Sequence, residues 1–297
     1  MAMSSLTVEL RPDLVDWPHT RPVRGALVPV VNTLREQDRV IATLGDLAEL
    51  LPDRAPQSTA RALREAGWLF PMRTSGVWGF AGARLGAPRA PGYLELHARM
   101  RVRPDTPACI AGKTVAMLHN WLWRPVGSAI GMPPGVKVPR CLGDLTVHRW
   151  DPQIDLDEFL GLPMWKPETL LCYMAARPSR ISWEDVQEWL WAVCENLELD
   201  LLLAELEGRP RAVWMKTGYL ADVGERPHLG EAVVAAAPAG GRGPYVLGWR
   251  ERNLPYSVWD SPVRVPKYGI VDYLLPRRWC PKLGFEPFEP PKTWEFD

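Results

Sequence analysis

The segment GDLAELLPDRAPQSTARALREAGWLF, Gly45–Phe70, decides how the N-terminal part of this 297-residue chain is interpreted. Leu47 and Leu50 give its first half the apolar spacing of a short helix, and a Pro-rich break follows at residues 52–56. A second helical pattern ends at Gly67, a residue type that commonly stops helices. The pattern fits two structures, an ordinary helical hairpin that buries its own core and a helix-turn-helix that reads DNA.

The second helical pattern divides into a small apolar face and a polar face. Ala60 and Leu63 share one side of a helix over Pro56–Ala66. Arg on the other side can bind N7 and O6 of guanine, Gln can pair with adenine, and hydroxyls suit phosphates or bases. The helix N-terminus adds partial positive charge for a phosphate. The candidate DNA-binding residues, including flanking arginines, are Arg54, Gln57, Ser58, Thr59, Arg61, Arg64 and Arg73.

A β-hairpin is predicted directly after this helix. In WLFPMRTSGVWGF, residues 68–80, two short apolar runs flank Thr74-Ser75-Gly76. The order helix, helix, hairpin is that of a winged helix-turn-helix, with the Thr-Ser-Gly turn at the wing tip. Residues 1–86 carry 10 Lys/Arg and 9 Asp/Glu, a weaker basic excess than winged helices usually have. A winged-helix protein-interaction module without DNA readout therefore stays open as an alternative.

Charge and composition divide the chain further. Residues 87–150 contain 9 Lys/Arg and 3 Asp/Glu, whereas residues 151–230 contain 7 and 15. Either the basic segment faces a polyanion, or the two segments pair with each other in the fold. Gly82–Gly92 is rich in Gly, Pro and Ala and is predicted to be a linker. We expect an α+β fold, with an N-terminal arm (the first 20 residues) and winged helix-turn-helix domain in residues 1–85 and a larger mixed α/β domain in residues 86–297.

The larger domain is predicted to mix helices and strands. Helical spacing occurs at 113–123, 168–176, 183–206 with a break near Asn196, and 212–225; two strands are expected within 136–150, and short β runs at 245–249 and 263–275. Ser182 and Asp185 form a start like a capping box for the helix at 183.

No motif for an enzyme stands out. The five His form no His-x-x-x-His pair, and His119 and His148 are expected to be ordinary core or surface residues. The carboxylates at 184–185 and at 200, 205 and 207 are interpreted as solvated helix faces. The loop at 240–243 lacks a following Lys-Ser/Thr and is read as a flexible turn. We predict no catalytic residue, no metal site and no cofactor; an enzyme whose site is assembled from distant residues remains an alternative.

Cysteine spacing and the N-terminus bear on the compartment. The five Cys are far apart, with no Cys-x-x-Cys pair, which is typical of free thiols in a reducing cytoplasm. The N-terminus has no signal-peptide pattern, and no apolar run approaches the roughly 20 residues of a membrane helix. A cytoplasmic protein without membrane contact is expected.

Residues 44–80 resemble the N-terminal winged helix of AbiE-type (AbiEi-like) antitoxins, in which a Leu-rich helix is followed by an Arg-rich helix, Gly-Trp-Leu and a short hairpin. Later segments match in order and extend the resemblance over about 40–275; they are TVAMLHNWLW, VPRCLGDLTVHRW, LPMWKPETLLCYMA and VWMKTGYLADVGE. The Arg-, Pro- and Ala-rich composition is similar to that of actinobacterial, mycobacterial-like members. The sequence departs from the family at the wing, which reads Thr-Ser-Gly-Val-Trp-Gly and has little charge, so Trp78 is expected in the core; the tail after Pro276 has no counterpart.

The resemblance implies a transcriptional repressor that binds double-stranded DNA at inverted repeats in its own promoter and autoregulates its operon. It further implies an antitoxin of a type IV toxin–antitoxin system. The functional partner would be a nucleotidyltransferase-like toxin, with which no stable complex is expected.

Overall fold

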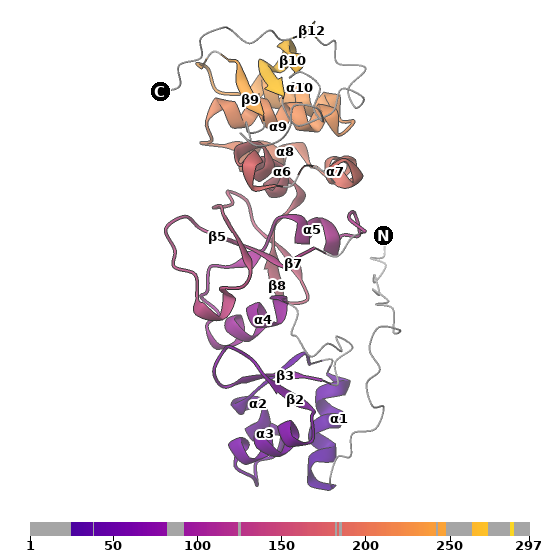
Figure 1. The fold of residues 1–297 in the computed structure, drawn as a ribbon, viewed down its shortest axis with the longest axis vertical. Helices are drawn as coiled ribbons and strands as arrows, with labels where there is room; N and C mark the ends of the chain where they lie inside the picture. The colour runs from indigo at the N-terminus through magenta and orange to yellow at the C-terminus, as the bar shows by residue number, and fades with distance from the viewer. Residues whose placement is uncertain are drawn as a thin grey trace, which may run out of the picture. The chain divides into compact units, whose positions relative to one another are not determined.

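The computed structural model describes residues 25–37, 39–81, 92–123, 126–181, 183, 186–241, 243–247, 263–272 and 286–287. The chain divides into two compact units, coloured in sequence order in Figure 1: the first is 1–106 with 139–144, and the second is 107–138 with 145–297. Both units combine helices with β-sheet, which confirms the α+β class. The predicted arm, and all of the predicted linker except Gly92, lie outside the described residues.

The first unit is built around a three-stranded antiparallel sheet with the order β1-β3-β2. Its elements are η2 (Gly25–Leu27), α1 (Val28–Glu36), β1 (Ile41–Thr43), α2 (Leu44–Leu50), α3 (Pro56–Glu65), β2 (Leu69–Pro71), β3 (Val77–Phe80), α4 (Gly92–Val102) and η3 (Arg140–Leu142). The predicted boundary at residue 85 therefore falls before α4, a helix that the structure groups with the first unit.

Local sequence signals set the ends of these elements. Thr43 and Asp46 form a capping box that begins α2, since each side chain accepts from the other residue's backbone N–H. Pro56 occupies the first turn of α3, where its missing N–H costs no helical hydrogen bond. Gly67 follows α3 with φ at +75°, and Gly76 takes φ at +76° in the β2–β3 turn. Glycine adopts such angles without the steric penalty of a Cβ.

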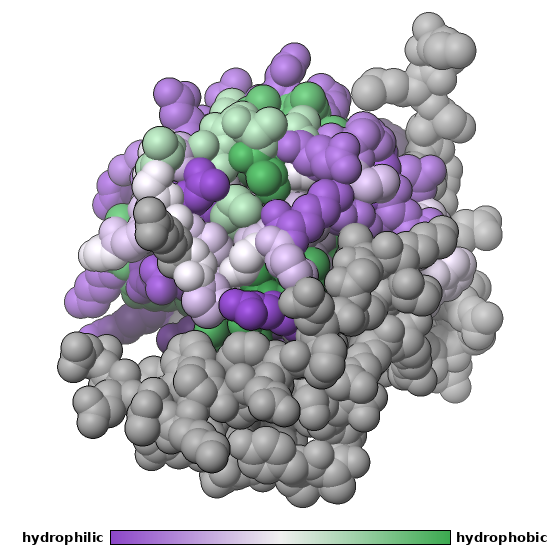
Figure 2. Space-filling view, turned by 90° about the horizontal axis from the view of Figure 1, so that it is seen from above, coloured by the Kyte–Doolittle hydropathy of each residue, from purple (hydrophilic) through white to green (hydrophobic). Residues whose placement is uncertain are grey.

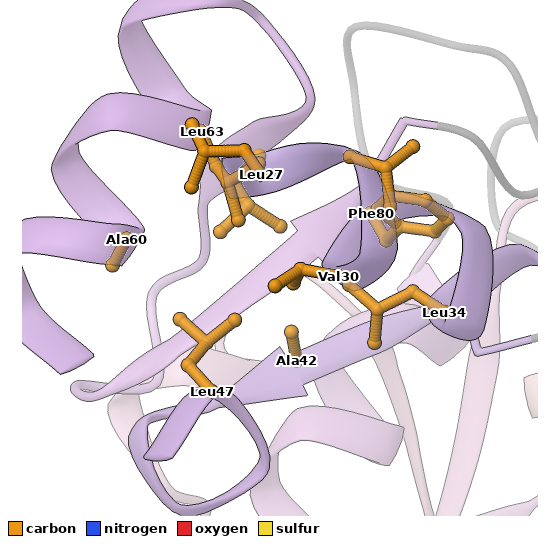
Figure 3. Close-up of a cluster of buried hydrophobic side chains, with 10 residues drawn as sticks. Leu27, Val30, Leu34, Ala42, Leu47, Ala60, Leu63 and Phe80 are labelled. Atoms are coloured by element: carbon orange, nitrogen blue, oxygen red, sulfur yellow. The ribbon is translucent and has the colours of Figure 1, made fainter. Parts of the chain in front are cut away.

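The sheet of the first unit buries a different set of side chains on each face. On one face, α1, α2 and α3 pack over Ala42 of β1 and Phe80 of β3 (Figure 3). On the other face, Ala98 of α4 packs with Ile41 and Val77. Two adjacent residues of β1 thus point into two separate cores, as strand alternation requires. Trp78 is partly buried against the first core, in line with its expected place.

The second unit holds two sheets and most of the helices. Its first sheet has the order β6-β5-β4-β8-β7, and its second has the order β12-β10-β11-β9. The elements are β4 (Cys109–Ile110), α5 (Lys113–Leu118), β5 (Ala129–Met132), β6 (Thr146–Arg149), β7 (Asp157–Phe159), β8 (Leu162–Met164), α6 (Pro167–Ala176), η4 (Pro178–Arg180), α7 (Val186–Glu195), α8 (Leu199–Leu206), α9 (Arg211–Val223), α10 (Pro227–Ala236), β9 (Tyr245–Leu247), β10 (Val263–Val265), η5 (Pro266–Tyr268), β11 (Ile270–Asp272) and β12 (Glu286–Pro287).

Helix α6 is the centre of the second unit. Every residue from Pro167 to Ala175 is buried, because the helix packs against α7, α8 and α9 and contacts the first sheet through Tyr173. Further along the chain, Tyr219 of α9 donates to Asp272 of β11 at 2.8 Å, which ties the helices to the second sheet. Figure 2 views the end that carries α9 and α10 in Figure 1, where hydrophilic residues surround a smaller hydrophobic group on the coloured surface.

Several predictions for the second unit are confirmed and others are wrong. The helix at 168–176 and the break near Asn196 are confirmed, and the helix predicted at 212–225 is α9, which ends at Val223. The long helix predicted at 113–123 stops at Leu118, because Asn120 takes a left-handed backbone with φ at +58°. The first of two strands predicted within 136–150 is instead the short helix η3, which lies between Pro139 and Gly143. The capping pair Ser182 and Asp185 lies outside the described residues.

Helix α10 matched no predicted element, and neither did α4. No helix in the described part of the chain is both long enough and apolar enough to span a membrane.

Candidate nucleic-acid interface

Helix α3 is seated on the first unit by its small apolar face. Ala60 and Leu63 are buried in the same core as Leu27 and Val30, the group drawn in Figure 3. Ala55 is the N-cap of α3, and its carbonyl accepts from the N–H groups of Ser58 and Thr59 in the first turn, at 2.9 and 3.1 Å. Because Ala60 and Leu63 are fixed in the core, the opposite side of α3 faces away from it.

The opposite face of α3 is polar and open. Its exposed side chains recur at helical spacing and span about 120° of the helix circumference; they are Gln57, Ser58, Arg61, Arg64 and Glu65. Arg61 and Arg64 form no ion pair with any residue that the structure describes. The two guanidinium groups, without an ion-pair partner among the described residues, lie on one face beside an amide and a hydroxyl, and these are donors that base edges and phosphates accept from.

Arg54 lies in the exposed loop just before α3. Its backbone N–H bonds to Leu51 O at 3.2 Å, which closes the turn after α2. The guanidinium has no ion-pair partner within the described ranges. Arg54 therefore adds a positive group beside the N-terminus of α3, where the unpaired helical N–H groups also favour an anion.

Thr59 does not belong to this face. The residue is fully buried and its hydroxyl donates to Ala55 O at 3.4 Å, within its own helix. Its position two residues after Gln57 turns it about 200° away, towards the core. The prediction that Thr59 contacts DNA is therefore wrong, and six exposed candidates remain.

Arg73 lies near the β2–β3 turn, after α3 in the sequence, and its side chain is paired with a carboxylate. Its guanidinium forms an ion pair and hydrogen bond with Asp144, and its backbone N–H donates to Glu95 Oε1 at 2.9 Å. The hydrogen bond with Asp144 raises the pKa of Arg73, and the same bond lowers the pKa of Asp144. No local pattern predicts either carboxylate, since Asp144 lies 71 positions from Arg73 and Glu95 lies 22.

The carboxylates predicted to lie on a solvated helix face near α8 do not all face solvent. Glu205 is completely buried rather than solvated, so that expectation is wrong. It accepts from Trp150 Nε1 at 2.9 Å, from Gln153 N–H at 2.9 Å and from Arg209 at 3.1 Å. Arg209 also stacks 4.0 Å over the Trp150 ring. A buried carboxylate with this many donors holds the second unit together, and its lone pairs are used internally. Glu207 is exposed as expected, and Glu184 and Asp185 lie outside the described residues.

His119 and His148, which the sequence predicts to be ordinary core or surface residues, are packed within the second unit. His148 is buried and its Nδ1 lies 2.9 Å from Tyr173 Oη. Burial, with the charge of Arg180 as a smaller cause, lowers the pKa of His148, and burial raises the pKa of Tyr173 to about 12. His119 stacks on Trp121 with the ring centroids 4.3 Å apart. Both histidines thus have structural contacts.

A strand–Gly–Lys–Thr–helix order at residues 109–118 resembles part of a phosphate-binding loop. The Thr114 hydroxyl, however, donates to Gly127 O at 3.3 Å and accepts from Ala129 N–H at 2.9 Å. Gly112 takes φ at +62°, and a Cβ there would overlap the His148 ring. Both residues serve the packing of this loop. Among the residues that the structure describes, no group of three or more His, Cys, Asp or Glu side chains is placed to hold a metal ion.

Comparisons with known proteins show a shared fold. No family model matches the chain, and no curated protein matches it. The structure is similar to the crystal structure of the RV2827C protein from Mycobacterium tuberculosis, with a TM-score of 0.68 and 26% sequence identity. The match covers 86% of this chain and 94% of that chain, so the likeness extends over most of both folds.

Proposed function

We propose that the first unit is a winged helix-turn-helix domain that binds double-stranded DNA, with α3 in the major groove. Helices α2 and α3 would form the helix-turn-helix, and the β2–β3 hairpin would be the wing. The order of α1, β1, α2, α3 and the two hairpin strands around one antiparallel sheet supports this assignment. In such domains the second helix of the pair presents its N-terminal residues to base edges.

The observation that carries the proposal is the division of α3 into two faces. Ala60 and Leu63 anchor the helix, while Arg61, Arg64 and Gln57 project from it with their donors unused within the described structure. Arg can bind guanine through two acceptors and Gln can bind adenine in the same way. The phosphate backbone would be met by Arg54 and by the N-terminus of α3.

DNA binding is tested by titrating the full chain into a labelled fragment from upstream of its own gene, with a scrambled fragment of equal length as the control. We expect a specific complex that persists at about 100–200 mM salt, where non-specific contacts weaken steeply. Equal affinity for both fragments would mean that the protein binds the phosphate backbone of DNA without reading its sequence. Absence of any complex would overturn the DNA-binding proposal and favour a winged-helix module that binds protein.

We further propose that the protein represses its own operon and acts as the antitoxin of a type IV toxin–antitoxin system. This part rests on the sequence resemblance of residues 40–275 to AbiE-type antitoxins. Growth of cells that express a nucleotidyltransferase-like toxin from the adjacent gene should recover when this chain is co-expressed. The two proteins should elute separately in size-exclusion chromatography; a stable complex would contradict the type IV assignment, and failure to restore growth would contradict the antitoxin role.

A further inference from the structure

The tip of the β2–β3 hairpin carries one arginine, whose guanidinium and backbone N–H bond to two different carboxylates. Arg73 is paired through its guanidinium with Asp144 and through its backbone N–H with Glu95 of α4, at 2.9 Å. Thr74, next along the tip, is buried, whereas Ser75 and Gly76 are exposed. The tip therefore presents a single positive side chain whose charge is already neutralised.

Asp144 reaches this tip from a distant part of the sequence. Residues 139–144 follow β5 and precede β6 in the chain, yet they pack with the first unit, where η3 contacts α4. Leu142 of η3 is completely buried and anchors the segment two residues before Asp144. The carboxylate is thus held near Arg73 by packing that does not depend on the ion pair itself.

The two bonds of Arg73 have different consequences for its mobility. The bond from its N–H to Glu95 fixes the backbone of the tip, while the guanidinium is at the end of a long side chain that is half exposed. Asp144 is still more exposed, with 71% of its side chain open to solvent. Ion pairs this exposed are weak, since water and salt screen them. The Arg73 side chain can therefore exchange Asp144 for another anion without moving the hairpin.

We propose that Asp144 is an electrostatic latch on the wing: it competes with a DNA phosphate for Arg73 and sets the affinity of the DNA complex. The proposal rests on the DNA-binding function proposed above. While Asp144 pairs with Arg73, the wing offers no free positive charge, and a phosphate can bind Arg73 only by displacing Asp144.

The test uses the full chain and the upstream DNA fragment. Asp144→Asn keeps the side-chain shape and removes the charge, and Asp105→Asn is the matched control, because it removes an exposed carboxylate of the same unit for which the structure describes no ion pair. We expect Asp144→Asn to bind DNA roughly two- to eightfold more tightly than the wild type. The lower end, about twofold, corresponds to the loss of a weak competing ion pair. The upper end, about eightfold, corresponds to one additional phosphate contact near about 0.1 M salt. Its salt slope should steepen by up to about 0.9.

A double-mutant cycle with Arg73→Ala separates a latch from a general charge effect. In the Arg73→Ala background, Asp144→Asn should change affinity no more than Asp105→Asn does. The latch is wrong if Asp144→Asn and Asp105→Asn tighten binding equally, or if the gain persists without Arg73. If the wild type binds the fragment and Asp144→Asn binds no tighter, the latch proposal is overturned and the DNA-binding proposal is not. If none of the variants binds DNA, the proposed function falls together with the latch.

Discussion

Arg101 and Asp46 join α4 to α2 within the first unit: Arg101 Nη2 lies 3.0 Å from Asp46 Oδ1, although the residues are 55 positions apart in the sequence. The other oxygen of the same carboxylate accepts from the Thr43 hydroxyl at 2.7 Å and from the Thr43 N–H at 2.8 Å. One buried carboxylate therefore both begins α2 and ties it to the helix on the far side of the sheet.

Asp46→Asn should lower the free energy of unfolding by about 1–3 kcal/mol, because the amide cannot pair with Arg101 and accepts through one oxygen only. Urea denaturation measures the change. Glu49→Gln is the matched control, since it removes an exposed charge from the same helix and should change stability by less than about 0.5 kcal/mol. Equal unfolding midpoints for the two variants would show that Asp46 has no special role.

The contribution of Asp46 should depend on pH. Burial alone would raise the pKa of Asp46, but the hydrogen bonds from Thr43 and the charge of Arg101 outweigh burial and hold the pKa below its ordinary value. A lowered native pKa means that the stabilisation is complete above the unfolded-state pKa of about 3.9 and is lost as pH falls through the native pKa. The stability difference between wild type and Asp46→Asn should therefore be constant near neutral pH and shrink below about pH 4. A difference that grows on acidification would contradict this assignment.

The sequence predicts the segment around Gly45–Phe70 well because its signals are local. Gly67 and the Thr-Ser-Gly turn mark element ends by backbone preference alone, and the structure has the same ends. Helix α4 is different, because what stabilises it is Ala98 packing against Ile41 and Val77 from earlier in the chain. No local pattern in residues 92–102 reveals that face, so the helix and the extent of the first unit stayed unpredicted.

Glu205→Gln should destabilise the second unit by about 2–4 kcal/mol, because it leaves Arg209 facing a neutral amide in a buried site and places an NH₂ group where donors point. Thermal or urea unfolding measures the loss. Glu207→Gln, an exposed acidic residue at the end of the same helix, should be nearly neutral. A Glu205→Gln variant as stable as Glu207→Gln would show that the buried hydrogen bonds of Glu205 contribute little.

Helical periodicity predicts which residues of the candidate site are exposed and which are buried. Spacing places Arg61 and Arg64 outside and Leu63 inside, and their exposure and burial follow that pattern. The hydroxyl of Thr59 suits a DNA contact by residue type, but its position on the helix turns the side chain into the core, where it is fully buried. Glu205 looks like a solvated residue in sequence because its donors, such as Trp150 and Gln153, lie more than 50 positions away.

Arg61→Ala and Arg64→Ala should each weaken binding to the upstream fragment by about 1–3 kcal/mol if their guanidinium groups reach bases, and much less to a scrambled fragment. Fluorescence anisotropy at fixed salt measures both affinities. Arg35→Ala is the matched control, because it removes an exposed arginine from α1 of the same unit. If both α3 variants bind like wild type, another element must read the DNA.

Arg54→Ala should weaken binding to specific and scrambled DNA by the same factor, because Arg54 precedes α3 in an exposed loop suited to a phosphate contact. The slope of log affinity against log salt should fall by about 0.9 for one lost phosphate contact. The ratio of specific to non-specific affinity is the deciding measurement: it should stay at the wild-type value for Arg54→Ala and drop for Arg61→Ala. A drop in that ratio for Arg54→Ala would place this arginine on a base edge instead, and would extend the reading surface of α3 into the loop before it.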